Sequence, residues 1–283
     1  MIVLLIKNII AFFYLLTGSV SDIKTREVAD WSNYGLIAMG FASNAIFSIA
    51  FHDIRYVLYS VLGFLVLWLL ALLMYYSAQW GGGDAKMFMG LGALYGIGPG
   101  DGYAFMTSFI VNLLLAGSVY GIAWSLFAAF RNREKFLKTF IGLCKQKEPI
   151  AIMKIVLAAI AVSIVLYFFL DPYLRIVILS FSILAAGIFY LWLAIKAIEE
   201  SCMYKKISVS ELTEGDWIAE NIRRKGKQIC GPGDLGISKN QIFALKKLNV
   251  GKIKVKEGIP FVPSFLAGWL MTVFYGNFIM LLI

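Results

Sequence analysis

The sequence predicts an α-helical polytopic membrane protein with six to eight transmembrane helices and a small cytosolic α+β insert. Three features of the 283-residue chain support this fold class: 60% of its residues are hydrophobic, its mean hydropathy is +0.79, and only 15% of its residues are charged. Soluble domains have about a quarter of their residues charged. The charged residues also separate apolar runs of about 20 residues, the length that a helix needs to cross a bilayer.

Eight apolar segments are the candidate spans: residues 2–20, 32–51, 55–77, 85–98, 103–130, 150–170, 173–198 and 262–283. The first has no basic stretch before its apolar run and no A-x-A-like cleavage site, so we expect a permanent span rather than a signal peptide. The 85–98 segment is short, because 14 helical residues rise only about 21 Å against a hydrocarbon core of about 30 Å. We expect this segment to line a water-filled site or to depend on its flanking residues.

The positions of the basic residues indicate the orientation. If the N-terminus lies outside, 23 of the 26 Lys and Arg residues fall in or beside cytoplasmic segments, and only Lys7, Arg55 and Arg175 fall outside. This distribution follows the positive-inside rule. Topology and attraction to anionic lipid therefore account for the net charge of +9, and the predicted partner is the lipid bilayer rather than nucleic acid.

The spans and the charge pattern divide the chain into five predicted parts. Residues 199–258 mix short β-prone runs and glycine turns with one short helix, for which Ser238 is the expected cap. The five parts are a transmembrane core (1–130), a basic cytoplasmic loop (131–149), an additional helical hairpin (150–198), the small cytosolic α+β insert (199–258) and a C-terminal transmembrane helix (259–283).

Two aspartates at the predicted cytoplasmic edge form the candidate catalytic site. Asp22 ends the first span, and Asp84 begins the 85–98 helix directly after Gly81-Gly82-Gly83. Topology places both on one side of the membrane, so their carboxyl groups can meet if the two helices pack together. Paired carboxylates can share a proton and activate water against a peptide bond. Taken singly, each aspartate is more typical of a helix cap or an interfacial charge.

These stretches resemble a known family. Residues 81–84 fit the G-x-G-D motif of the GxGD membrane aspartyl proteases, and DIKTREV, beginning at Asp22, is similar to the first-aspartate motif of the archaeal type IV prepilin and preflagellin peptidases. The resemblance is best over the first 130 or so residues. It implies that Asp22 and Asp84 are the catalytic pair of an aspartic endopeptidase at the cytoplasmic face of the plasma membrane. Its implied substrates are type IV pilin-like or archaellin precursors, which carry a basic leader (a class III signal peptide).

The resemblance implies no metal and no organic cofactor. The single histidine, His52, and three cysteines without a C-x-x-C spacing also fail to supply the usual ligands of a zinc site. Nothing in this sequence pattern predicts methyltransferase activity, which the long bacterial members with a tetracysteine zinc domain possess.

Further residues at the same face are predicted to contact the substrate. The glycines leave backbone without side chains, which gives room for an extended peptide. The IPFVP stretch is similar to a proline-containing motif near the active site of several GxGD proteases, although proline also favours the start of any helix. Two acidic residues close to Asp22 can attract a basic leader, although ordinary interfacial acids are commoner. The predicted substrate-binding residues are Gly81, Gly82, Gly83, Glu27, Asp30, Pro260, Phe261 and Pro263.

Other functions compete with this hypothesis. An ion- or proton-coupled transporter would use the same aspartates, but these lie at one interface and the chain shows no inverted repeat. A non-catalytic scaffold would recruit a partner through the insert. An intramembrane protease of presenilin-like specificity would cut nearer the middle of the bilayer. Gly117 and Gly121 form a G-x-x-x-G pattern that permits a homodimer, although we expect it to serve packing within the chain.

Overall fold

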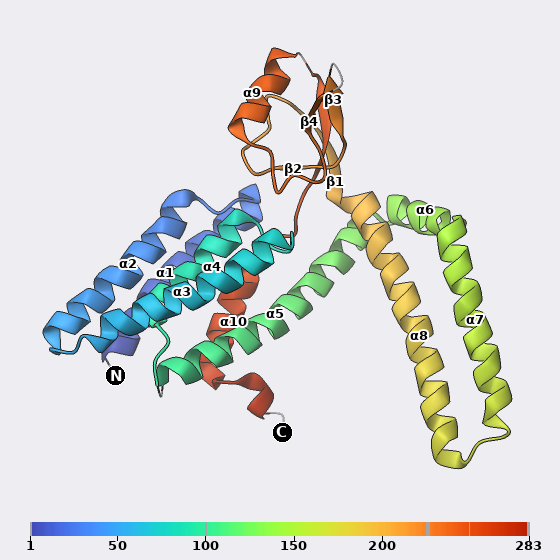
Figure 1. Ribbon diagram of the computed structural model, residues 1–283, viewed down its shortest axis with the longest axis horizontal. Helices are drawn as coiled ribbons and strands as arrows, with labels where there is room; N and C mark the ends of the chain where they lie inside the picture. The colour runs from blue at the N-terminus through green and yellow to red at the C-terminus, as the bar shows by residue number, and fades with distance from the viewer. Residues whose placement is uncertain (1, 100, 225–226, 249, 282–283) are drawn as a thin grey trace. The chain divides into compact units, whose positions relative to one another are not determined.

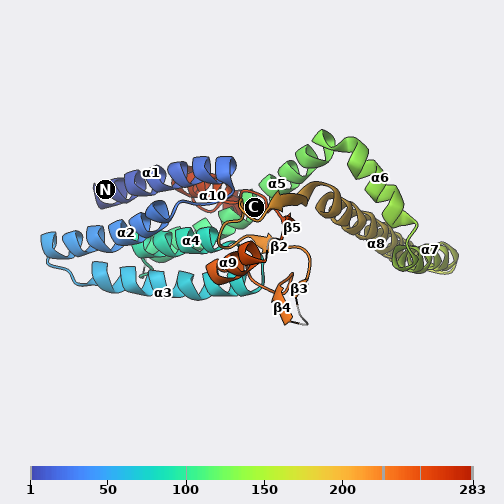
Figure 2. The same ribbon diagram turned by 90° about the horizontal axis from the view of Figure 1, so that it is seen from above.

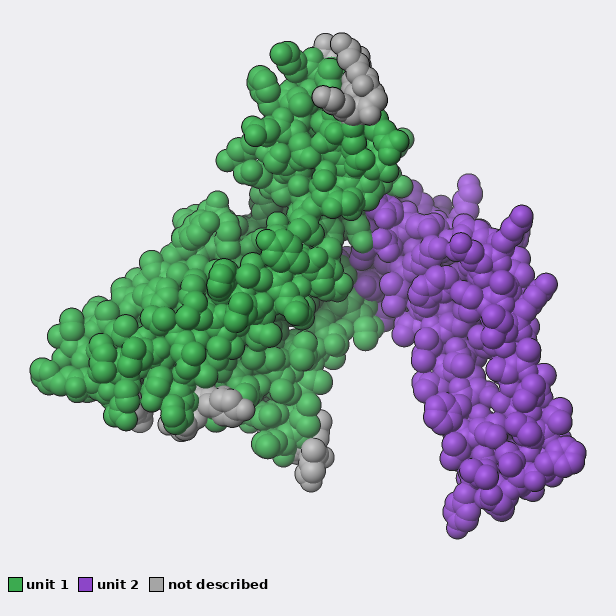
Figure 3. All heavy atoms as spheres, viewed as in Figure 1, with its two compact units in different colours: residues 1–122, 206–283 green, residues 123–205 purple. Residues whose placement is uncertain are grey.

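The structure is a computed structural model that describes residues 2–99, 101–224, 227–248 and 250–281. It is predominantly helical, with one small strand-containing region, and this confirms the predicted fold class (Figure 1). The chain divides into two compact units, residues 1–122 with 206–283 and residues 123–205 (Figure 3). All of the predicted site residues lie in the first unit.

Long helices dominate the described part of the chain, and they identify a multi-pass membrane protein. Five of them are long and apolar enough to cross a bilayer: α1 (Ile2–Thr25), α3 (Arg55–Tyr76), residues 104–131 of α5 (Asp101–Arg131), α7 (Lys147–Tyr167) and α8 (Pro172–Ile198) together with the π-helical turn η1 (Glu199–Met203). The first unit also contains α2 (Asp30–Ala50) and two helices of 14 residues, α4 (Gly82–Tyr95) and α10 (Val262–Tyr275).

The short helix α4 is the centre of the first unit, and it packs against both α2 and α3 (Figure 2). Glycines allow these helices to approach closely. A Cβ atom built on Gly92 would lie 2.5 Å from the backbone oxygen of Gly63, and one built on Gly40 would lie 2.7 Å from the backbone nitrogen of Leu94. The backbones themselves are therefore in contact at these crossings. Side chains such as Leu36, Leu67 and Met87 fill the core around them.

Polar side chains from neighbouring helices donate hydrogen bonds to the last carbonyl groups of α4. The last carbonyl groups of a helix have no partner within it, so a helix that ends among other helices needs donors from its neighbours. Asn44 Nδ2 of α2 donates to the carbonyl oxygens of Ala93 (3.0 Å) and Leu94 (2.9 Å), and the Ser60 hydroxyl of α3 also donates to Ala93. The buried Lys7 ammonium of α1 donates to the carbonyl of Tyr95. These donors allow a helix too short to span the bilayer to end inside the protein.

The insert is α+β, as predicted. Its strands are β1 (Tyr204–Ser208), β2 (Trp217–Ile218), β3 (Ile222–Arg224), β4 (Lys227–Cys230) and β5 (Lys252–Lys256), and its helix is α9 (Lys239–Lys247). They form a three-stranded sheet in the order β1-β5-β2, with β2 antiparallel to β5, and a separate β3–β4 hairpin. Ser238 caps α9 by accepting a hydrogen bond from the backbone of Gln241, as predicted. The insert has its own core, which includes Ile218, Leu245 and Ile253.

The second unit contains the hairpin of α7 and α8, whose Ser163 and Ser182 hydroxyls are hydrogen bonded to each other. It also corrects one prediction, because residues 131–149 are not simply a loop. They contain the helix α6 (Arg133–Cys144). Phe136, Phe140 and Leu143 recur at helical spacing in this otherwise basic segment, and the three side chains pack with α8.

Two predicted helix ends also need correction. The first helix continues beyond residue 20 to Thr25, so Asp22 lies within it. The last helix stops at Tyr275 instead of continuing to residue 283, because Gly276 takes a positive φ of 68° that a helix does not accommodate. A short 3₁₀ helix, η2 (Phe278–Leu281), follows.

Candidate active site

Asp22 lies on the buried face of α1. The buried residues of this helix include Leu15, Gly18 and Asp22, which recur every three or four positions and so share one face. The Asp22 side chain is only 5% exposed. Its Oδ2 atom accepts a hydrogen bond of 2.9 Å from the backbone N–H of Val262, the first residue of α10. A carboxylate from the first helix thereby caps the last one.

Asp84 occupies the third position of α4. Its Oδ2 atom accepts a hydrogen bond of 3.1 Å from the backbone N–H of Gly81, which immediately precedes the helix. A carboxylate in the first turn stabilises a helix by satisfying a free N–H group and by facing the positive end of the helix dipole. The G-G-G-D sequence therefore places the carboxylate in the first turn of α4, directly after the connection from α3.

The structure brings Asp22 and Asp84 into one site. Close packing of α1, α4 and the α1–α2 connection holds them there: a Cβ atom on Gly18 would lie 2.7 Å from Met87 of α4, and one on Gly83 would lie 3.1 Å from two side-chain atoms of Val28. The two carboxyl groups are near enough for the charge of Asp22 to act on Asp84. Their role as a catalytic pair stays a prediction.

The residues that precede α10 lie beside this pair. Pro260 is buried, Phe261 is the N-terminal cap residue, and Pro263 is the second residue of α10, where proline is favoured. The Phe261 ring lies 5.9 Å from the ring of Trp80 and 5.7 Å from that of Phe265, measured between centroids. Ring contacts therefore join the G-G-G-D turn to the start of α10.

The sequence analysis missed Trp80, although its signal was an aromatic residue directly before the glycines. Its ring centroid lies 5.3 Å from that of Phe265 and 5.1 Å from that of Phe88 on α4. We call Trp80, Phe88, Phe261 and Phe265 the aromatic cluster. It joins the G-G-G-D turn and α4 to the start of α10.

Arg26 and Tyr120 were also missed. Arg26 follows the end of α1 with a positive φ of 62°, and its backbone N–H donates to the carbonyl of Asp22 at 2.9 Å. Its guanidinium Nε lies 3.6 Å from a carboxylate oxygen of Glu257, and its charge acts on Asp22. Tyr120 of α5 lies within electrostatic reach of Asp22 and Arg26. Asp22 and Arg26 are four residues apart, a spacing that brings neighbouring residues together on a helix and so could have predicted their contact. No pattern in the sequence around Tyr120 predicts its position near Asp22.

Glu27 and Asp30 are exposed and have partners in the chain. The Glu27 carboxylate accepts a hydrogen bond from the Thr213 hydroxyl of the insert. The Asp30 carboxylate forms an ion pair of 2.8 Å with Lys86 of α4, which also lies over the Tyr34 ring. Their attraction for a basic leader stays a prediction.

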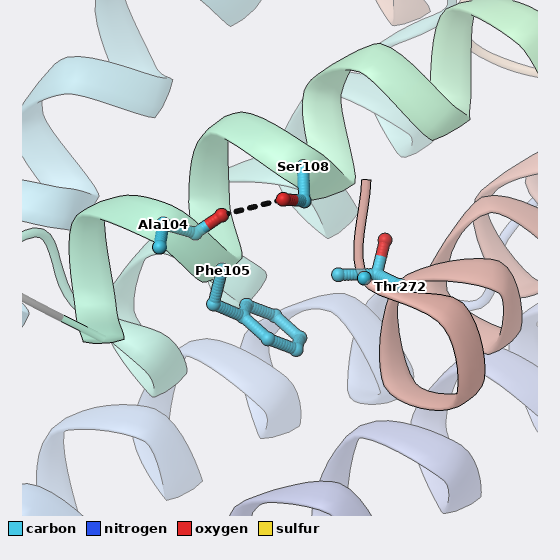
Figure 4. Close-up of a pocket in the computed structure, with 5 residues that line it drawn as sticks. Ala104, Phe105, Ser108 and Thr272 are labelled. Carbon is cyan, nitrogen blue, oxygen red and sulfur yellow. Dashed lines mark hydrogen bonds between the residues drawn. The ribbon is translucent and has the colours of Figure 1, made fainter. Parts of the chain in front are cut away.

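A cavity of about 220 Å³ lies elsewhere in the first unit (Figure 4). It is lined by Ala104, Phe105 and Ser108 near the start of α5 and by Thr272 and Gly276 near the end of α10. Thr272 comes ten residues after Val262, a rise of about 15 Å along a helix. None of the predicted site residues lines this cavity, so it is distinct from the aspartate pair.

The three glycines before Asp84 are not equivalent, and substitution by alanine distinguishes them. A Cβ atom on Gly83 would press on Val28 at 3.1 Å, whereas the nearest atom to one on Gly82 is 4.0 Å away. We expect Gly83→Ala to lower the thermal unfolding midpoint in detergent. We expect Gly82→Ala to leave this midpoint unchanged. If Gly82 faces the substrate, its alanine variant raises KM instead; equal unfolding midpoints for the two variants would contradict the packing argument.

Comparison with known proteins gives a consistent result. The model of the type IV leader peptidase family matches residues 9–126, a range that includes both aspartates. The chain is 30% identical over 137 residues to the preflagellin peptidase of Methanocaldococcus jannaschii, with 45% of this chain and 58% of that protein covered. It is 20% identical to the prepilin peptidase EppA of Methanothermobacter thermautotrophicus over 374 aligned positions, which cover 100% of this chain and 97% of that protein.

A shorter match agrees with these. The chain is 36% identical over 90 residues to the preflagellin peptidase of Methanococcus maripaludis, with 32% of this chain and 39% of that protein covered. The chain thus spans between about two fifths and three fifths of the two preflagellin peptidases. No solved structure matches the chain. Residues 9–126 are therefore similar to the type IV leader peptidase family.

Proposed function

We propose that the protein is an aspartic endopeptidase that removes the basic leader from type IV pilin-like or archaellin precursors at the cytoplasmic face of the plasma membrane. The observation that carries the proposal is the meeting of Asp22 and Asp84 in one site, inside the region that matches the family. Of the three relatives described above, two are named for preflagellin and one for prepilin, which supports this substrate class.

The chemistry follows from two carboxyl groups that share one proton. The ionised carboxylate takes a proton from water while the water oxygen bonds to the peptide carbonyl carbon, and the protonated carboxyl gives its proton to the carbonyl oxygen. The resulting gem-diol collapses as its carbon–nitrogen bond breaks. The newly protonated carboxyl gives its proton to the departing nitrogen, and a gem-diol hydroxyl gives its proton to the other carboxylate. One water is consumed, an acid and an amine are formed, and the pair returns to its singly protonated state.

The location of the pair suits a cut at the junction between leader and helix. Asp22 lies near the end of α1 and Asp84 near the start of α4, so both are at helix ends rather than at the middle of a span. The positive-inside distribution supports a cytoplasmic location for these ends. Trp80 and Phe261 are the partly exposed members of the aromatic cluster, and they offer an apolar surface for the first residues of the precursor helix while the leader remains in water.

The test is cleavage of a precursor in membranes that contain the wild-type protein. One substrate carries a lysine-containing leader before an apolar helix, and its control has the same helix without the leader. We expect a single cut at the junction, located by mass spectrometry of the new N-terminus. A cut within the apolar helix would favour presenilin-like specificity. No cut on several leaders, with the protein shown to accumulate, would contradict the proposal.

A further inference from the structure

We propose that α6 lies in the interface of the membrane and binds the headgroups of anionic phospholipids. On one side of this helix Leu137 and Ile141 enter the hydrocarbon, and on another side Lys135 and Lys138 contact the lipid phosphates. The helix comes after the range that matches the family, so that match assigns it no role. The inference concerns the second unit alone and does not depend on the proposed function.

Short connections hold α6 at the membrane. A single residue, Asn132, separates it from α5, and two residues, Lys145 and Gln146, separate it from α7. Both neighbouring helices are long and apolar enough to cross a bilayer. A helix joined so closely to the ends of two spans cannot move far from the surface at which they end. Figure 1 shows α6 lying across the α7–α8 hairpin, at the end opposite the hairpin turn.

The helix α8 covers one side of α6. Phe136, Phe140 and Leu143 of α6 form a small core with Leu193 and Ala197, which lie near the end of α8. Their spacing of three and four residues places the three α6 side chains on one face. This contact fixes the rotation of α6 about its own axis, so the helical repeat gives the directions of its other side chains.

A second side of α6 is apolar but exposed. Leu137 is 53% exposed and Ile141 is 52% exposed, and the two are four residues apart. Each directly follows one of the phenylalanines that pack with α8, so it lies about 100° around the helix from that ring. The hydrophobic effect disfavours this side in water. Beside two membrane spans, it is suited to the boundary between lipid headgroups and acyl chains.

A third side of α6 is basic. Lys138 directly follows Leu137, and Lys135 directly precedes Phe136, so both lysines point away from α8. They belong to a stretch, residues 131–149, that contains six basic and only two acidic residues. The six are Arg131, Arg133, Lys135, Lys138, Lys145 and Lys147, and all are exposed. Within the part of the chain that the structure describes, none of the six forms an ion pair.

Anionic phospholipid is the partner that these two sides fit together. Basic side chains next to a membrane are attracted by the negative charge of its headgroups, over a distance set by the salt concentration. An apolar side beside a basic side is the combination found in helices that lie in such an interface. A soluble polyanion or free phosphate would use the lysines but would leave Leu137 and Ile141 in water. The geometry therefore favours a lipid.

The first experiment compares the surroundings of two adjacent residues. A nitroxide label is attached to Leu137→Cys or to Lys138→Cys in the full chain, with Cys144, Cys202 and Cys230 replaced by alanine. The protein is placed in vesicles of phosphatidylcholine and phosphatidylglycerol. Oxygen concentrates in hydrocarbon and a nickel chelate in water. We expect the ratio of oxygen to nickel accessibility to be several-fold higher for the label on Leu137→Cys. Equal ratios at the two positions would overturn the proposal.

The second experiment measures lipid selectivity in the detergent-solubilised full chain. Fluorescent phosphatidylglycerol and phosphatidylcholine of equal chain length are the probes. At low salt we expect the anionic lipid to bind about tenfold more tightly or better, and Lys135→Gln/Lys138→Gln to remove most of this preference. Lys246→Gln/Lys247→Gln removes the same charge from exposed positions of α9 in the insert, and it should keep the preference.

Three outcomes of the second experiment would overturn the proposal. They are equal binding of the two lipids by the wild type, an equal loss of preference in the two double variants, and displacement of bound phosphatidylglycerol by inorganic phosphate. In the last case the lysines would recognise a free anion rather than a lipid.

Discussion

Asp22→Asn and Asp84→Asn are each expected to lower precursor cleavage by about 10²- to 10⁴-fold, because an amide can neither accept nor release the shared proton. The change alters little else. Asn has the same shape, and its side-chain oxygen can still accept the hydrogen bond from Val262 or from Gly81. Both variants should therefore insert and accumulate normally. Initial cleavage rates in membranes with matched protein levels provide the measurement.

Asp53→Asn is the matched control for these variants. Asp53 lies between α2 and α3, where it forms an ion pair of 2.8 Å with Arg55. Its variant should cleave at the wild-type rate. Near-normal cleavage by Asp22→Asn or by Asp84→Asn would show that the corresponding carboxylate is structural and that the two-aspartate mechanism is wrong.

Gly63→Ala is expected to give the largest loss of stability among single-methyl additions in the first unit. At the crossing of α3 and α4, a Cβ atom on Gly63 would overlap the backbone of Gly92 and lie 2.7 Å from Cα of Gly96. Backbone atoms cannot rotate away as a side chain can. Overpacking of this kind costs about 1–3 kcal/mol or more, and each kcal/mol lowers the unfolding midpoint of a chain of this size by roughly 2–4 °C.

Gly187→Ala makes the same chemical change in α8, where a Cβ atom would meet nothing within 4 Å. Alanine is up to about 1 kcal/mol more favourable than glycine within a helix, so this variant should unfold at the wild-type temperature or slightly above it. Thermal unfolding in one detergent, followed by circular dichroism, compares the pair. A Gly63→Ala midpoint equal to that of Gly187→Ala would contradict the close backbone contact.

Patterns of hydropathy and charge predicted the helices and the shared side of Asp22 and Asp84, because each depends on residues near one another in sequence. Helix ends were predicted less well. The end at Tyr275 depends on the conformation of Gly276, and α6 was missed because its positive charges masked three apolar side chains at helical spacing. Three apolar side chains change the overall composition of this basic segment too little to predict a helix.

The surroundings of the aspartates could be predicted only in part. The resemblance indicated the stretch around Phe261, which does lie beside Asp22. Trp80 and Tyr120 lie near the site because of tertiary packing. The sequence within a few residues of each does not predict which helix it contacts. Asn44 and Ser60, which donate hydrogen bonds to a carbonyl group at the end of α4, could likewise not be predicted from sequence. Their role depends on how α2, α3 and α4 pack together.

The hydrogen bond from Val262 to Asp22 joins residues 240 positions apart. During synthesis, α1 and α4 enter the membrane long before the ribosome has translated the start of α10. In that interval Asp22 lacks the partner that holds its carboxylate, and the aromatic cluster lacks Phe261 and Phe265. The proposed peptidase should thus remain inactive until α10 has been translated, a delay that follows from the order of these elements along the chain.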